Sequence, residues 1–182
     1  MKHGRMIGIL LLGLALVGIA SEANAESRIG VGYFRPEAPI GVRIWAAPKI
    51  GIDLGIGFQT EDVPDPTQQD PNNTSTKVGF TFDGGVPIVL VGDATSTAFF
   101  VRPGIAFSSE PVSADDNATD IVVSGHLGVE HHFAKWFSLE VAHGIYFSSH
   151  DPGTPGSDST TQFASEAFGI SSLGFHAYIF GD

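Results

Sequence analysis

Residues 50–60 read IGIDLGIGFQT, and this stretch decides the fold because its apolar residues alternate strictly with small or polar ones. One face carries Ile50, Ile52, Leu54, Ile56 and Phe58, and the other carries Gly51, Asp53, Gly55, Gly57 and Gln59. Successive side chains of a β-strand point to opposite sides, so a period of two indicates a strand. The stretch therefore predicts a strand with one apolar face and one small, polar face.

Seven further segments suit strands, namely residues 28–34, 40–46, 77–91, 97–109, 120–131, 136–148 and 162–180. Most of their connections alternate between short ones (47–49, 92–96, 133–135) and long acidic ones (61–76, 110–119, 149–161), and only 35–39 is shorter than its position suggests. No helical period follows Ala25. Eight strands joined in this way predict an all-β fold, an antiparallel up-and-down barrel.

The first 25 residues have the features of a secretory signal peptide. A charged start is followed by an apolar run over residues 7–20, and Ala23-Asn24-Ala25 forms a small-x-small cleavage site. We expect a mature chain of residues 26–182 that forms one barrel domain. No second apolar stretch reaches the roughly 20 residues that a membrane helix needs, so any membrane crossing would be made by strands.

Composition excludes several classes of function. Nine Lys and Arg residues stand against 20 Asp and Glu, for a net charge of −11, which argues against nucleic acid as a partner. Cysteine is absent, which excludes disulfides, thiol chemistry and the lipidated cysteine of a lipoprotein.

Alternation alone does not distinguish a membrane barrel from a soluble one, because the two differ only in which face points inward. The non-apolar face is rich in Gly, Ala and Ser, which suits a crowded lumen. Phenylalanines cluster near strand ends, and Trp45 and Trp136 lie near short turns, as in the aromatic girdles of a bilayer interface. We therefore expect an outer-membrane barrel in contact with outer-membrane lipid. An exported soluble barrel that binds an apolar ligand is the alternative.

Six charged residues share the phase of the small residues and so point into the predicted lumen: Arg43, Asp53, Asp83, Arg102, Glu130 and Glu140. An isolated buried charge is very costly, so these groups must be paired or hydrated. We hypothesise a network in which Arg43 and Arg102 each bridge two carboxylates. Such a network would plug and stiffen the lumen, and its sharper alternative role is a gate for ions or small solutes.

The final strand carries the segment Gly174-Phe175-His176-Ala177-Tyr178-Ile179-Phe180. It resembles the C-terminal strand of bacterial outer-membrane barrels, in which a glycine is followed by spaced aromatic residues. The resemblance implies that Gly174, Tyr178 and Phe180 form a motif read by the barrel-insertion machinery, although Gly181 and Asp182 follow here. The mature chain is similar in length and layout to small OmpA-like and OmpW-like barrels, which include anchors, adhesins, narrow channels and a few lipid-modifying enzymes.

The histidines invite a metal or catalytic interpretation: His126, His131, His132, His143, His150 and His176. No spacing resembles a closed zinc site, and interfacial or loop positions are expected instead. Ser124, His126 and Glu140 share the lumen face, but the His-x-Ser-Asn type motif of outer-membrane lipid A deacylases is missing. We expect no catalytic, cofactor or metal site, and a lipid-modifying enzyme remains an alternative.

The long connections concentrate negative charge, with Glu61, Asp62, Asp65, Asp70, Glu110, Asp115, Asp116, Asp151 and Asp158. They suit either divalent cations or a plain solvated surface, since no ordered ligand spacing is present. The sequence as a whole favours a structural or surface protein of the outer membrane, with narrow pore activity left open. A channel for small solutes or hydrophobic compounds is the alternative.

Overall fold

The computed structural model describes residues 28–36, 38–64, 74–113, 116–154, 156–165 and 172–180, and the predicted signal peptide lies outside them. The strands are β1 (Arg28–Tyr33), β2 (Ile40–Ala47), β3 (Ile50–Pro64), β4 (Thr74–Gly85), β5 (Ile88–Gly92), β6 (Thr97–Pro111), β7 (Asn117–Ala134), β8 (Phe137–Asp151), β9 (Thr160–Ser165) and β10 (Ser172–Phe180). Within these residues, no helix is long and apolar enough to cross a membrane.

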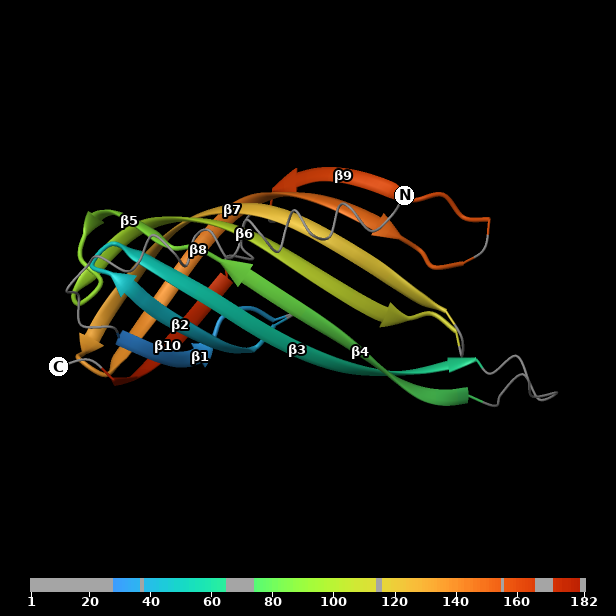
Figure 1. Ribbon diagram of the computed structural model, residues 1–182, viewed down its shortest axis with the longest axis horizontal. Helices are drawn as coiled ribbons and strands as arrows, with labels where there is room; N and C mark the ends of the chain where they lie inside the picture. Colours follow the sequence, from blue (N-terminus) through green and yellow to red (C-terminus); the bar gives the residue numbers. More distant parts are fainter. Residues whose placement is uncertain are drawn as a thin grey trace.

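The strands close into a barrel (Figure 1). They follow the order β10-β1-β2-β3-β4-β6-β7-β8, and β10 also pairs with β8, which closes the ring. Two of the eight strands of the barrel are each interrupted and so count as two elements. β4 and β5 both pair with β6, and β9 and β10 both pair with β8. The predicted eight-stranded, antiparallel, up-and-down barrel is therefore confirmed.

The two faces of the wall differ as the alternation predicts. Large apolar side chains such as Leu54 and Leu127 are exposed on the outside, while charged side chains such as Arg43 are buried inside. The prediction that Trp45 belongs to an outer aromatic girdle is wrong, because its side chain is only 2% exposed and lies in the barrel core. Trp45 follows Gly41 and Arg43 in steps of two, and this phase turns it inward. Trp136 is exposed.

Side chains fill the barrel at the short-turn end. Trp45 and Tyr178 belong to a buried apolar cluster with Val89, Ala94 and Ala98. Arg28, the first described residue, donates hydrogen bonds to the carbonyls of Ala94 and of Lys135 in two different turns. Its guanidinium also lies 4.4 Å from the centre of the Tyr178 ring. Arg28 thus links β1 to two turns on other sides of the barrel at this end.

At the long-loop end, the barrel wall is shorter over one part of its circumference, and we call this part the side notch. β2 begins at Ile40, opposite Ile56, so residues 57–64 of β3 have no strand beside them on that edge among the described residues. On the other side of the notch, β9 pairs with β8 and with no other strand in the part of the chain that the structure describes. Figure 1 shows β3 and β4 extending well beyond β1, β2 and β10. Among the described residues, the paired wall is therefore lower between β3 and β9.

Candidate functional site

Arg43 is the centre of the charged network in the lumen. It points inward from β2 opposite Asp53 of β3, and its Nε and Nη2 donate to the two oxygens of Asp53 at 2.7 and 2.8 Å. Its Nη1 donates to Glu130 at 2.9 Å and to Glu140 at 2.5 Å. Arg43 therefore reaches three carboxylates, one more than the two proposed from the sequence.

The same cation resolves a repulsion across two strands. Glu130 of β7 and Glu140 of β8 stand directly opposite each other, and like charges in such a pair are destabilising. Arg43 Nη1 lies between them and compensates both charges. The Arg43 guanidinium carbon also lies within 5.7 Å of the ring centres of Trp45 and Phe100, so the cation is enclosed by aromatic faces as well as carboxylates.

Arg102 extends the network toward the long-loop end. Its Nε donates to Asp53 at 2.7 Å, and its Nη2 donates to Asp83 of β4. Arg102 thus bridges two carboxylates, and Asp53 in turn joins the two arginines. The structure brings all six sequence-predicted charges together in one continuous set of ion pairs.

Glu130 is held from the short-turn side by neutral groups. The hydroxyls of Ser138 and Tyr178 donate to its Oε1 at 2.6 and 2.7 Å, and Trp45 Nε1 donates to the Tyr178 hydroxyl at 3.0 Å. The charged layer is therefore continuous with the aromatic layer beneath it. Together they fill the lumen, and we call them the lumen plug.

Phe34, Arg35 and Ala38 of the connection between β1 and β2 lie in the lumen above the plug, which the sequence pattern did not predict. Phe34 is buried, with its ring 4.6 Å from His176 and 5.6 Å from the Arg43 guanidinium carbon. Gly41 leaves room for this ring, because a Cβ there would lie 1.9 Å from Phe34 Cδ2. No periodic pattern marks the connection, and its unusual shortness was the only available signal.

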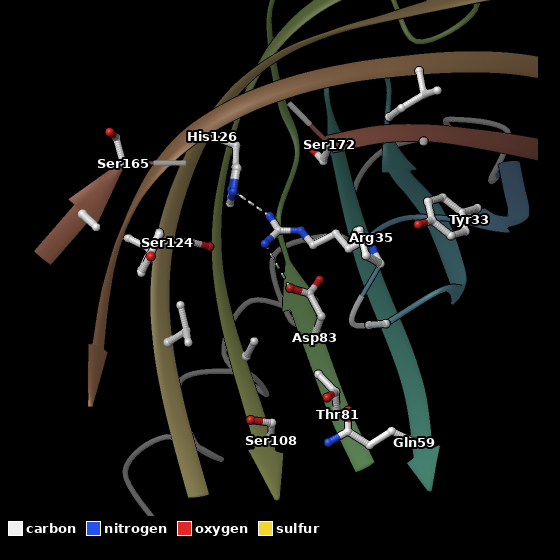
Figure 2. A pocket seen from close by; sticks show the side chains of 18 of the residues that line it. Tyr33, Arg35, Gln59, Thr81, Asp83, Ser108, Ser124, His126, Ser165 and Ser172 are labelled. Carbon is white, nitrogen blue, oxygen red and sulfur yellow. Dashed lines mark hydrogen bonds and ion pairs between the residues drawn. The ribbon is translucent and has the colours of Figure 1, made fainter. Parts of the chain in front are cut away.

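Arg35 follows Phe34 and reaches across the lumen (Figure 2). Its Nη2 lies 2.8 Å from His126 Nε2, and its Nη1 lies 3.9 Å from Asp83 Oδ1. The same Nη2 lies 2.9 Å from His126 Nδ1, so the guanidinium contacts both nitrogens of the imidazole ring. The Arg35 side chain is 16% exposed, compared with 0% for Arg43 and 3% for Arg102, so it is the most accessible of these three cations.

A cavity of about 1020 Å³ opens above Arg35. Small and polar side chains such as Thr81, Ser124 and Ala106 line its walls, and Tyr33 and Tyr146 add aromatic surface. Leu173 and Phe175 of β10 also line it, although both are exposed. The cavity is therefore amphipathic, with a cation at its base and apolar groups from β10 along its wall.

The expectation that the histidines lie in loops or at the interface is wrong for His132 and His176, which are buried because they share the inward phase of their strands. His126 is also buried, on the lumen face where its phase in the sequence places it. The side chains of Glu130, Glu140 and His176 come close enough together to hold a metal ion. However, the Arg43 guanidinium already bridges the two carboxylates, and its positive charge opposes a second cation there.

The three residues considered for catalysis, Ser124, His126 and Glu140, lie in two different environments. Ser124 and His126 line the cavity, where His126 contacts Arg35. Glu140 instead accepts its hydrogen bond from Arg43 in the plug. The contacts of His126 and Glu140 are thus with arginines, which is typical of charge compensation and not of a nucleophile–base–carboxylate relay.

The acidic connections and the final strand contribute less to the site. Asp65, Asp70 and Asp115 lie outside the described residues, while Asp62 accepts a hydrogen bond from the Thr76 hydroxyl at 2.6 Å. In the C-terminal motif, Gly174 and Tyr178 are buried, and the backbone of Phe180 pairs with Ile29 of β1. The final strand therefore forms the closing seam of the barrel.

No protein-family model, no curated protein and no solved structure matches the chain.

Proposed function

We propose that the protein is an integral outer-membrane barrel with a structural or surface role, and that its lumen does not conduct ions. Export by the N-terminal signal peptide and insertion through the C-terminal motif belong to this proposal. The acidic connections then face the exterior, where divalent cations can bridge them to neighbouring anionic lipid. The proposal includes no enzymatic activity.

The distribution of apolar and charged side chains carries the proposal. The outer wall exposes large apolar groups on every long strand, including Leu54, Phe82, Ile105, Leu127 and Val141, and the six charges of the lumen network are buried inside. A monomer in water rarely exposes more than a few hundred Å² of continuous apolar surface, whereas hydrocarbon favours such a belt. At the short-turn end, the Phe137 ring lies between two other rings. Its centre is 6.5 Å from that of Phe133 and 5.7 Å from that of Trp136. Such aromatic clusters suit the membrane–water interface.

The lumen plug supports the absence of conduction. Arg43, Asp53, Glu130 and Ser138 have no exposed surface, and the aromatic layer lies directly beneath them. An ion would have to break several charge-assisted hydrogen bonds to pass this level. The narrow pore activity left open by the sequence is therefore not part of the proposal.

Membrane fractionation with heat-modifiable gel migration tests the membrane assignment. We expect the mature chain in the outer-membrane fraction, with a compact unheated band that shifts on boiling. Recovery from the soluble periplasm without detergent would contradict the proposal and favour the soluble ligand-binding barrel.

A second function is favoured by the side notch. The notch lies beside a cavity of about 1020 Å³, which reaches the upper end of the usual range of about 300–1,000 Å³ for ligand pockets. Because the plug closes the cavity from below, a hydrophobic compound bound there would not pass through the barrel. This candidate function is ligand capture in a blind pocket. Retention of a radiolabelled amphipath by the barrel in nanodiscs, above the level of empty nanodiscs, tests it.

A further inference from the structure

We infer that the barrel is matched to a thin bilayer, whose hydrocarbon core is about 19–27 Å thick, and that its longest strands continue beyond that core. This inference rests on the proposed membrane location, and it adds the kind of bilayer that fits the wall and the depth at which the barrel sits. Two rings of phenylalanine mark the boundaries, and we call the outward residues between them the apolar belt.

One boundary of the apolar belt is a phenylalanine ring at the long-loop end. Phe58 of β3, Phe107 of β6 and Phe147 of β8 are exposed on the outer wall. Phe80 of β4 pairs with Phe58, and its ring centre lies 5.8 Å from that of Phe107. Phe163 of β9 pairs with Phe147. Aromatic girdles of this kind mark the edges of a membrane-spanning band.

The other boundary lies at the short-turn end. Phe99 of β6, Phe133 of β7 and Trp136 are exposed there, and Phe137 begins β8 beside them. Between the two boundaries, most outward side chains of β6, β7 and β8 are aliphatic: Val101, Ile105, Ile121, Val123, Leu127, Val129, Leu139, Val141 and Ile145. Pro103, Gly125 and His143 are the exceptions on these three strands. The belt there is therefore apolar except for one histidine.

The two rings are eight to ten positions apart along a strand. Phe107 follows Phe99 by eight positions on β6, and Phe147 follows Phe137 by ten on β8. A strand rises about 3.3 Å per residue and tilts by about 35–45° in a membrane barrel, so the rings are about 19–27 Å apart along the barrel axis. An average hydrocarbon core is about 30 Å thick, and a shorter belt must thin it at a cost in free energy. The belt therefore fits a bilayer thinner than average.

Beyond the long-loop ring, the outward side chains become mostly polar. They are Thr60 and Asp62 of β3, Thr76 of β4, Ser109 of β6, Thr119 of β7, and Ser149 and Asp151 of β8. A hydroxyl or a carboxylate is costly in hydrocarbon, so the wall leaves the core at the ring. The strands stay paired there, as Asp62 and Thr76 do, and Figure 1 shows β3 and β4 extending well beyond β1, β2 and β10.

Lysine substitutions on one strand locate the edge of the belt. Val141 lies between the rings on β8, and Ser149 lies two positions beyond Phe147 in the same outward phase. The full mature chain is refolded into phosphatidylcholine vesicles, and urea titration measures the equilibrium constant for unfolding. Val141→Lys should raise this constant about 30- to 900-fold, because a lysine near the bilayer midplane costs about 2–4 kcal/mol. Ser149→Lys should raise it less than about sixfold, because the cost near the interface is about 0–1 kcal/mol.

The chain length of the lipid tests the thickness without a substitution in the belt. The wild-type chain is refolded into fluid phosphatidylcholine vesicles with monounsaturated chains of about 14 to 22 carbons, and its stability should be greatest at about 14 or 16, because mismatch costs free energy for every ångström. Combining Thr60→Leu, Thr119→Leu and Ser149→Leu raises the belt on three strands and should move the optimum to longer chains. Val141→Leu, which keeps the belt at its present height, is the matched control.

Equal penalties for the two lysine substitutions, or greatest stability at about 18 carbons or more, would overturn the inference although the barrel remains a membrane protein. The same conclusion follows if the triple leucine variant keeps the wild-type optimum. A mature chain that stays soluble without detergent and tolerates Val141→Lys would reject the proposed function as well.

Discussion

Asp53 is the residue on which both lumen arginines depend. Its carboxylate accepts two hydrogen bonds from Arg43 and one from Arg102, and none of the three side chains is more than 3% exposed. Removal of one partner from a buried ion pair leaves an uncompensated charge in a poorly solvated place. The network is therefore more sensitive to a missing carboxylate than a surface ion pair would be.

We predict that Asp53→Asn lowers the free energy of unfolding by about 3–5 kcal/mol. Urea unfolding of the barrel refolded into vesicles measures this change. Asp158→Asn, which neutralises an exposed loop carboxylate, is the control and should change stability by no more than about 0.5 kcal/mol. Equal effects of the two substitutions would show that the network contributes little.

A second residue-scale prediction concerns Asp93 in the turn between β5 and β6. Hydrogen bonds from the side chains of Thr95 and Ser96, and from the Thr95 backbone N–H, lower the pKa of Asp93 from 3.8 to about 2. Because the folded pKa lies below the unfolded one, the stabilisation is complete above pH 3.8 and is lost as the pH falls toward 2.

We expect Thr95→Val to raise the pKa of Asp93 toward 3.8, because the largest contribution to the shift is removed. Carbon-13 NMR titration of the Asp93 carboxyl measures the change. Thr154→Val, in a different loop, should leave the titration unaltered. An unchanged Asp93 titration in Thr95→Val would contradict the assignment.

At the scale of the element, β7 shows how the two faces tolerate side chains differently. A Cβ at Gly128 would lie 2.3 Å from Cζ of the buried Phe100 ring, whereas a Cβ at Gly125 would meet nothing within 4 Å. The inward position is thus fixed by packing in the lumen plug. The outward position is open.

We predict that Gly128→Ala destabilises the barrel by about 1–3 kcal/mol through overpacking. Gly125→Ala on the same strand should change stability by less than about 1 kcal/mol, or increase it, because the unfolded chain loses freedom without a clash. Parallel urea titrations compare the two variants. A larger loss for Gly125→Ala would contradict the inward assignment of Gly128.

The strands could be predicted from the sequence, but their contacts across the lumen could not. The period of two identified the strands and placed Arg43, Asp53 and Glu130 on one face, because alternation is a local property. It did not predict which carboxylate meets which arginine, since that depends on the stagger of the closed barrel. The inward fold of Phe34 and Arg35 escaped prediction, because an irregular connection has no period to follow.

At the scale of the whole molecule, the barrel has two different halves. The short-turn half is filled by the lumen plug, and the long-loop half holds the cavity and the side notch. The gate hypothesis requires that the Arg102 ion pairs alone close the lumen. The structure instead has the Arg43 layer and the Trp45–Tyr178 layer beneath Arg102.

We therefore predict that both the wild-type protein and Arg102→Ala are silent in planar bilayers. Loss of Arg102 would widen the cavity but leave the lower layers closed. Single-channel recording measures this, with a known porin reconstituted in parallel as the positive control. Stable conductance that changes on Arg102→Ala would restore the gate hypothesis.

The contacts of the plug join residues that are far apart in the sequence. Arg43 and Glu140 are 97 residues apart, and Arg28 reaches a carbonyl 107 residues away. Arg43 and Asp53 are only 10 residues apart and can pair within β2 and β3, whereas the contacts of Arg43 with Glu130 and Glu140 need the distant strands β7 and β8. Strands β7 and β8 without β2 would hold Glu130 and Glu140 opposite each other with no Arg43 between them, whereas the completed barrel must break several distant contacts together before it opens. We therefore expect the completed network to slow unfolding, because contacts that form late in folding act mainly on the unfolding rate.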